Sequence, residues 1–142
     1  MSKRYYTVAQ ANGVLPELRR RMAELQQARE DIAVRRLQLS RLRREGDSTG
    51  APDPDRFFLE EAEIEFILIT ARQLIDQLIE RGIEVKDIDA GLVDFLTLID
   101  GEEAYLCWRS GEPEVRYWHG LDEGFAGRRR IAGDARFDPA AE

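Results

Sequence analysis

The stretch GLVDFLTLIDGEEAYLCWRSGEPEVRYWH, residues 91–119, decides the fold. Apolar and polar residues alternate over much of it, which is the period of a β-strand. Asp100-Gly101 is typical of a tight hairpin turn, and SGEP at 110–113 indicates a second turn. The stretch therefore predicts a three-stranded antiparallel meander, with strands at about 92–99, 103–109 and 114–119.

Side chains of such a meander alternate between two faces. A two-residue turn at Asp100-Gly101 places Asp94 opposite Cys107. If the second loop sets Arg109 opposite Glu114, Cys107 faces Arg116. One face is then nearly all apolar and is expected to pack on helices: Val93, Phe95, Ala104, Leu106, Trp108, Val115, Tyr117 and His119. The other face collects Leu92, Asp94, Leu96, Tyr105, Cys107, Arg109, Glu114, Arg116 and Trp118. A three-residue loop at either turn would move one strand to the opposite register and scramble these faces.

Helical signals precede the meander. Thr7 and Gln10 have the spacing of a capping box, and Pro16 fits best in the first turn of a second helix. Residues 7–45 are therefore expected to form a short helix near 8–12 and a long helix from about 14. Apolar residues at helical spacing predict a further helix over 57–82, which Gly82 would terminate.

The remaining segments complete the expected organisation. Residues 46–56 are rich in Gly, Pro, Ser and Asp, which is typical of a flexible loop between antiparallel helices. The tail, 132–142, is expected to fray. With 142 residues, one domain is the natural expectation. We predict an α+β fold, in which a long, coiled-coil-like antiparallel helical hairpin carries the C-terminal meander and its turns, 83–131.

The long helix carries a line of apolar residues spaced by seven, as in a coiled coil: Leu18, Leu25, Ile32 and Leu39. At 1.5 Å per residue it would span roughly 45 Å and the second helix roughly 36 Å, so it should overhang its partner. An overhanging apolar line predicts an interface, and a homodimer is the simplest way to cover it.

Composition limits the possible partners and locations. The formal net charge of −7 disfavours nucleic acid and anionic membrane surfaces as partners. The arginines of residues 14–45 are interleaved with acids, as on a solvated, ion-paired face. A single cysteine excludes an internal disulfide and multi-cysteine zinc ribbons. No apolar run has the length of a membrane span, and no secretory signal is visible, so a cytoplasmic protein is expected.

The polar face of the predicted meander holds one candidate ligand site: Asp94, Cys107, Arg109 and Arg116. Two guanidinium groups beside aromatic side chains could bind a carboxylate or a phosphate, and would favour a cysteine thiolate. The alternative is structural. The acids then neutralise the arginines across the strands, and Cys107 is a small buried apolar residue.

His119 and Asp122 are a second candidate, for a divalent metal or an acid–base pair. No spacing matches an established metal motif, and a histidine satisfied at the rim of the core is the alternative. A Cys107–His119 catalytic dyad is disfavoured, because the register above sets the two side chains on opposite faces. The GFAGRRR stretch, 124–130, could form an anion-binding nest or a simple turn.

The motifs resemble a family of small bacterial proteins known as domain of unknown function 2203. The resemblance lies in YYTVAQANGVLPEL at the start, then GIEVKDIDAGLVDF, EAYLCWRSGEPEVRYWH and LDEGFAGRR. Gly13 stands where the family usually has leucine. The resemblance implies no activity. It places twelve residues at motif positions: Lys86, Asp87, Asp89, Gly91, Asp94, Cys107, Trp108, Arg109, Gly111, Glu112, His119 and Gly127.

Three classes of function are open at this point. The favoured one is a non-enzymatic interaction protein that self-associates through its helical hairpin and needs no cofactor. The second is a protein that binds a small anion or a divalent metal on the polar face of the meander. The third is a small thiol-dependent or hydrolytic enzyme, for which the sequence identifies no catalytic residue.

Overall fold

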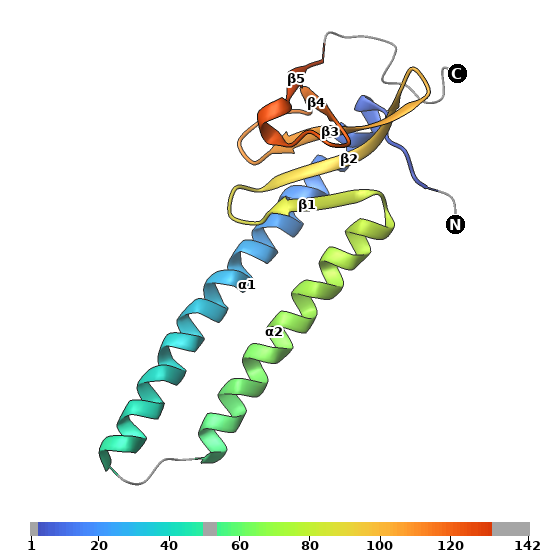
Figure 1. Ribbon diagram of the computed structural model, residues 1–142. Coiled ribbons are helices and arrows are strands. Elements are labelled where there is room, and N and C mark those ends of the chain that lie inside the picture. Colours follow the sequence, from blue (N-terminus) through green and yellow to red (C-terminus); the bar gives the residue numbers. More distant parts are fainter. Residues whose placement is uncertain (1–2, 50–53, 132–142) are drawn as a thin grey trace. The chain divides into compact units, whose positions relative to one another are not determined.

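The computed structural model describes residues 3–49 and 54–131 (Figure 1). Two helices precede an antiparallel sheet, so the α+β class is confirmed. The sheet has five strands in the order β1-β2-β3-β4-β5, and the prediction of three strands is wrong. The elements are α1 (Val8–Thr49), α2 (Pro54–Glu80), β1 (Ile83–Asp87), β2 (Leu92–Ile99), β3 (Glu102–Arg109), β4 (Tyr117–Gly120), the 3-10 turn η1 (Phe125–Gly127) and β5 (Arg129–Arg130).

One continuous helix, α1, replaces the predicted short and long helices. The capping box at its start is confirmed: the Gln10 amide donates to Thr7 Oγ1 at 3.0 Å, and the Thr7 amide donates to Gln10 Oε1 at 3.0 Å. Ala11, Leu15 and Leu18 follow at helical spacing and are all buried. Their burial outweighs the helix-breaking tendency of Gly13 and Pro16, since tertiary packing overrides local propensity.

The connection between the helices is shorter than predicted. Because α1 runs to Thr49 and α2 begins at Pro54, both ends of the expected loop 46–56 are helical. Residues 50–53 and the tail 132–142 lie outside the described residues. Gly82 has φ +78° just after the end of α2, as expected for a glycine cap. Neither helix, over the part of the chain that the structure describes, contains an apolar stretch long enough to cross a membrane.

The chain divides into two compact units, residues 1–22 with 75–142, and residues 23–74. The second unit is an antiparallel hairpin of α1 and α2 (Figure 1). Leu25, Ile32 and Ile64 are buried in it, and Arg35 Nη1 lies 3.6 Å from Glu60 Oε2 on the other helix. A basic residue of α1 thus pairs with an acidic residue near the start of α2 within the hairpin.

The predicted interface line does not form an uncovered edge, and this prediction is wrong. Leu18, Leu25 and Ile32 are 0%, 2% and 8% exposed within the chain itself, and only Leu39 is partly exposed. Leu25 and Ile32 lie along the seam of the hairpin. Leu18 belongs to the unit that contains the sheet, which covers the start of α1. The spacing of seven therefore marks an intramolecular seam.

The β2–β3 hairpin has the predicted register. Asp94 pairs with Cys107 and Leu96 with Tyr105. The turn residues Asp100 and Gly101 have φ of 51° and 80°, as a two-residue type I′ turn requires. The apolar face of this hairpin, with Val93, Phe95, Leu106 and Trp108, is almost completely buried, as predicted.

The register of β4 differs from the prediction by one residue. Cys107 pairs with Tyr117 and not with Arg116, and Tyr105 pairs with His119. A slip of one residue exchanges the two faces of a strand. His119 therefore points to the same side of the sheet as Asp94 and Cys107. The prediction that His119 and Tyr117 lie on the apolar face is wrong.

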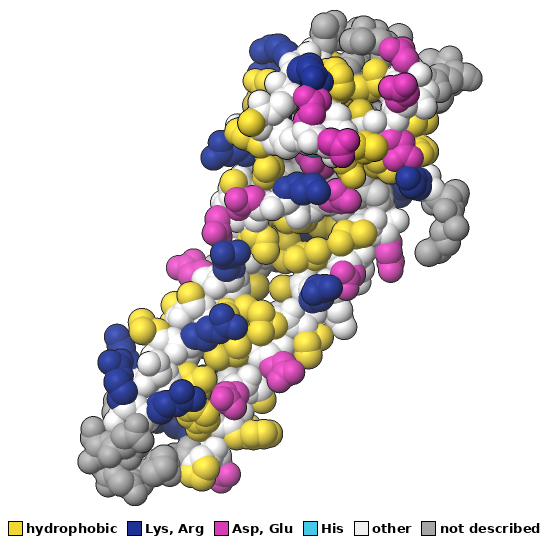
Figure 2. All heavy atoms as spheres, viewed as in Figure 1, with side chains coloured by type: hydrophobic (Ala, Val, Ile, Leu, Met, Phe, Trp, Pro, Cys, Tyr) yellow, Lys and Arg dark blue, Asp and Glu magenta, His cyan; other side chains and the backbone are white. Residues whose placement is uncertain are grey.

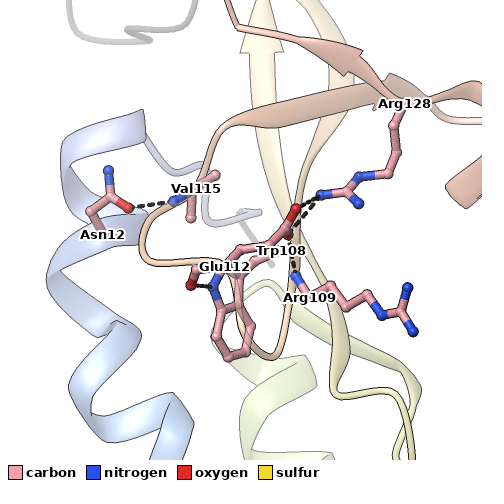
Figure 3. A network of polar contacts seen from close by, with 6 residues as sticks. All are labelled: Asn12, Trp108, Arg109, Glu112, Val115 and Arg128. Atoms are coloured by element: carbon pink, nitrogen blue, oxygen red, sulfur yellow. Dashed lines mark hydrogen bonds and ion pairs between the residues drawn. The ribbon is translucent and has the colours of Figure 1, made fainter.

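Contacts of the β3–β4 connection explain this slip (Figure 3). The Trp108 indole Nε1 donates to the Glu112 carbonyl at 2.9 Å, and the Arg109 amide donates to Glu112 Oε1 at 2.7 Å. The Val115 amide donates to Asn12 Oδ1 on α1 at 2.7 Å, so residues up to Arg116 are held outside the β3–β4 ladder. The first two bonds are local and the third joins distant parts of the chain, and none of them can be read from strand alternation.

Candidate functional site

Three adjacent strands bring Asp94, Cys107 and His119 together on the face of the sheet opposite the apolar core. Asp94 lies on β2, Cys107 on β3 and His119 on β4. One potential ligand atom from each lies within 4.8 Å of the other two. The residues are only 2%, 0% and 3% exposed. A carboxylate, a thiol and an imidazole group thus lie together in one buried cluster.

The two ring nitrogens of His119 have different partners. Nδ1 lies 2.8 Å from the carbonyl oxygen of Gly120, and Nε2 lies 3.0 Å from Asp94 Oδ2. A carbonyl oxygen can only accept, so Nδ1 carries a hydrogen. In a neutral imidazole Nε2 would then be an acceptor, facing a second acceptor on the carboxylate. A proton or a metal cation must therefore lie between Nε2 and the carboxyl group.

Asp94 has a second, unsatisfied oxygen. Its Oδ1 is buried and accepts no conventional hydrogen bond from the described residues, although the Cys107 thiol interacts with the same carboxylate. Buried polar atoms are nearly always hydrogen-bonded, and an exception requires an explanation such as an ion or a water molecule. The unsatisfied oxygen belongs to the same carboxylate that faces His119 and Cys107. This independent observation points to a ligand at the cluster.

Cys107 is a poor nucleophile in this environment. Burial raises the pKa of its thiol to about 12, and the negative charge of Asp94 adds to the shift. Since the thiolate is the reactive form, the thiol is inert near neutral pH. His119 cannot act as its base, because both ring nitrogens are already engaged. A metal ion would reverse this state, since a coordinating thiol loses its proton.

A part-buried ion pair lies close to the cluster. Arg128 Nη2 lies 2.7 Å from both carboxylate oxygens of Glu112, and the guanidinium stands 3.9 Å from the ring centre of Tyr117. Tyr117 is the cross-strand partner of Cys107. Figure 3 shows Glu112 turned toward Arg128 and toward the amide of Arg109. Glu112 and Arg128 could not be recognised as a pair from the sequence, because sixteen residues separate them.

The two arginines of the predicted anion site have contacts with other residues. Arg109 is exposed, and its guanidinium stands 5.6 Å from the ring centre of Phe125. Arg116 precedes β4 and pairs with Glu114 at 3.2 Å. Asp94 and Cys107 do meet, as predicted, but the third member of their cluster is His119, while both arginines contact other groups. The grouping of Asp94, Cys107, Arg109 and Arg116 as one anion site therefore stays a prediction.

The predicted partner of His119, Asp122, is exposed at the turn after β4. The carboxylate next to it, Glu123, turns back instead. Glu123 Oε1 accepts a hydrogen bond from the Gly120 amide at 2.9 Å, and Arg129 pairs with its other oxygen at 2.8 Å. The hydrogen bond lowers the pKa of Glu123, and the arginine adds to the shift. Among the described residues, Asp94 is the carboxylate that contacts His119 through a hydrogen bond.

The family comparison agrees with the motifs. The family model described as "Uncharacterized conserved protein (DUF2203)" matches residues 4–131. The chain belongs to the DUF2203 family. Neither curated proteins nor solved structures give a match. Asp94, Cys107 and His119 are among the residues that the resemblance placed at DUF2203 motif positions, and the fold brings these three into one cluster.

Proposed function

We propose that this DUF2203 chain binds one divalent transition-metal ion of the zinc type through Asp94, Cys107 and His119. Thiolate, imidazole and carboxylate are the ligand groups that proteins offer to such ions. The proposal is carried by the convergence of three buried donor atoms within 4.8 Å of one another. The 3.0 Å contact between His119 Nε2 and Asp94 Oδ2 requires a proton or a metal ion shared by the two acceptor atoms. The unsatisfied Asp94 Oδ1 supports the proposal.

Charge balance favours a divalent ion. A carboxylate and a thiolate together carry two negative charges, so a divalent cation with a neutral imidazole makes the buried cluster neutral. Without the ion, neutrality requires one proton at Asp94 and His119 and another on Cys107. Each bound ion should therefore displace about two protons, and metal binding of this kind is coupled to proton release.

The three donors would hold an ion through one protein ligand fewer than the four of a closed structural zinc site. Zinc–ligand bonds of about 2.0–2.3 Å place tetrahedral donor atoms about 3.5 Å apart, so donors that now lie up to 4.8 Å apart would move closer on binding an ion. The Gly120 carbonyl fixes the ring of His119 through Nδ1, as outer-shell groups commonly do for metal-binding histidines. An ion would link β2, β3 and β4 and stabilise the sheet.

The three alternative functions have less support. A thiol-dependent reaction needs a reactive thiolate, whereas Cys107 is buried and its pKa is raised to about 12. A small-anion site needs convergent cations, whereas the guanidinium of Arg109 lies over Phe125 and that of Arg116 pairs with Glu114. Self-association through the line from Leu18 to Leu39 loses its basis, because three of the four side chains are buried within the chain.

Cobalt binding tests the proposal directly. The metal-stripped chain is titrated with Co²⁺, and we expect a cobalt–thiolate charge-transfer absorption that saturates at one ion per chain. Zn²⁺ should displace the cobalt and raise the melting temperature. Cys107→Ser should abolish the absorption, while the matched variant Asp122→Asn should retain it. Absence of the absorption and of any melting shift, or an unchanged absorption in Cys107→Ser, would overturn the proposal.

A further inference from the structure

The helix α2 exposes several large apolar side chains within the unit formed by residues 23–74. Phe58, Leu59, Phe66 and Ile69 are 68%, 66%, 65% and 51% exposed. Hydrophobic side chains are visible at the surface of the hairpin in Figure 2. Single exposed apolar residues are common, but two phenylalanines and two aliphatic residues on one short helical segment are not.

These residues share one side of the helix. At 100° per residue, Phe58, Leu59, Phe66 and Ile69 fall with exposed Ala62 within an arc of about 100°. We call these five residues the α2 stripe. Aromatic side chains present 150–250 Å² each, so the stripe offers roughly 500 Å² of apolar surface. Patches of this size mark interaction sites on monomeric surfaces.

We propose that the α2 stripe binds the α2 stripe of a second copy of this chain, with the two helices antiparallel. The charges beside the stripe select this partner. Glu61, Glu65 and Arg72 follow one another along the same edge of the helix. In an antiparallel pair of identical helices this edge meets itself, so Glu61 of one copy lies at the level of Arg72 of the other. A parallel pair would set this edge against the opposite edge of the partner helix, so Glu61 and Arg72 would not meet.

The shapes of the side chains are compatible with the same alignment. If the two-fold axis lies near Phe66, Ile69 of each copy stands close to the small Ala62 of the other. Large side chains thus meet small ones, which allows close helix packing. The contact is closed by its symmetry. An area of roughly 500 Å² per copy is below the usual 800 Å² of stable complexes, so a monomer–dimer equilibrium is expected.

The proposed surface is different from the one predicted from the spacing of seven. Leu18, Leu25 and Ile32 lie inside the chain, whereas the α2 stripe is exposed on the outer side of α2. Self-association through the stripe does not depend on the metal centre, since all its residues lie within residues 23–74. Loss of metal binding would therefore leave self-association unchanged, and loss of self-association would leave metal binding unchanged.

Sedimentation equilibrium of the full-length chain over a wide concentration range tests the inference. The wild type should pass from monomer to dimer with rising concentration. Residue 66 occurs twice in the interface, once in each copy, so Phe66→Glu should raise the dissociation constant by about thirtyfold or more. The control Leu37→Glu makes the same kind of change at a residue that is 54% exposed on α1, and should leave the constant unchanged.

A charge exchange tests the orientation. Arg72→Glu alone should weaken the dimer several-fold, and the double variant Glu61→Arg, Arg72→Glu should restore it. Far-ultraviolet circular dichroism verifies that each variant keeps its helices. A chain that remains monomeric at all concentrations, or a dimer insensitive to Phe66→Glu, would overturn the inference. Failure of the double variant to recover would overturn the antiparallel arrangement.

Discussion

Asp94 and His119 contact each other across an intervening strand. Asp94 lies on β2 and His119 on β4, yet Oδ2 and Nε2 are 3.0 Å apart above β3, which carries Cys107. Both side chains are 3% exposed. Neighbouring strands lie about 4.8 Å apart, so the two side chains together span about 10 Å over the middle strand. The strand between the two therefore contributes the third member of the cluster.

Removing the Asp94 carboxylate should destabilise the metal-free protein. Asp94→Ala leaves His119 Nε2 buried without a partner, and breaking a buried pair of this kind costs about 3 kcal/mol. Asp94→Asn should cost less, because the amide can donate a hydrogen bond to a neutral imidazole. Urea unfolding followed by circular dichroism measures both free energies of unfolding.

The exposed Asp122 supplies the control for this measurement. Asp122→Asn should change the free energy of unfolding by less than about 0.5 kcal/mol. Equal stabilities of Asp94→Ala and Asp122→Asn would show that the Asp94–His119 contact contributes nothing to folding. If the Asp94→Asn variant still bound the metal, the Asp94 carboxylate would not be a required ligand.

Cys107 should react very slowly with a thiol reagent in the folded protein. Its pKa of about 12 leaves almost no thiolate at pH 8, and the side chain is fully buried. Reaction should proceed at an ordinary rate in denaturant, where the pKa returns toward 9.0. Absorbance after addition of an aromatic disulfide measures both rates. A fast reaction in the native state would instead favour the thiol-dependent enzyme.

The sequence could predict only the part of this cluster that depends on the first turn. Asp100-Gly101 specifies a type I′ turn by its own backbone preference, so the pairing of Asp94 with Cys107 followed directly. The second connection is determined by Trp108 and Glu112 and by Asn12 on α1, more than ninety positions away. Local preference contains no such information, and the one-residue error moved His119 to the wrong face.

The helices show a second limit of prediction from the sequence. A spacing of seven identifies an apolar seam, but it does not identify what covers the seam. Leu25 and Ile32 are covered within the chain, whereas the exposed Phe58 and Phe66 were not singled out by any repeat. Two-residue β5 is also too short to produce a period of two. Partner choice is a property of tertiary packing, and a single sequence leaves it open.

The ion pair between Glu17 and Arg81 should make stability depend on pH in the acidic range. The hydrogen bond from Arg81 lowers the pKa of Glu17 from its usual 4.5, with Arg81 Nη1 at 2.7 Å from the carboxylate. A lowered folded-state pKa adds stability above the unfolded value, and this stability is lost as pH falls through the folded value. Glu17→Gln should therefore cost up to about 1 kcal/mol at pH 7, since the pair is partly exposed.

Below pH 4.5 the wild type and Glu17→Gln should converge in stability. Thermal unfolding at several pH values measures the difference between them. The exposed Glu30 offers a comparison on the same helix, and Glu30→Gln should alter stability little at any pH. A gap between wild type and Glu17→Gln that stays constant into strong acid would contradict an ionic contribution and indicate lost packing.

Two glycines should respond to alanine in opposite directions. Gly13 lies inside α1, and a Cβ added there would have no atom within 4 Å, so Gly13→Ala should stabilise the protein by about 0.5–1 kcal/mol through helix propensity. Gly82 has φ +78°, and a Cβ there would lie 2.6 Å from the Arg4 carbonyl oxygen. Gly82→Ala should therefore destabilise by about 2 kcal/mol or more, because left-handed strain and a backbone clash add. Urea unfolding should give a higher midpoint than wild type for Gly13→Ala and a lower one for Gly82→Ala. An unchanged midpoint for Gly82→Ala would contradict the close approach of the N-terminal segment to the end of α2.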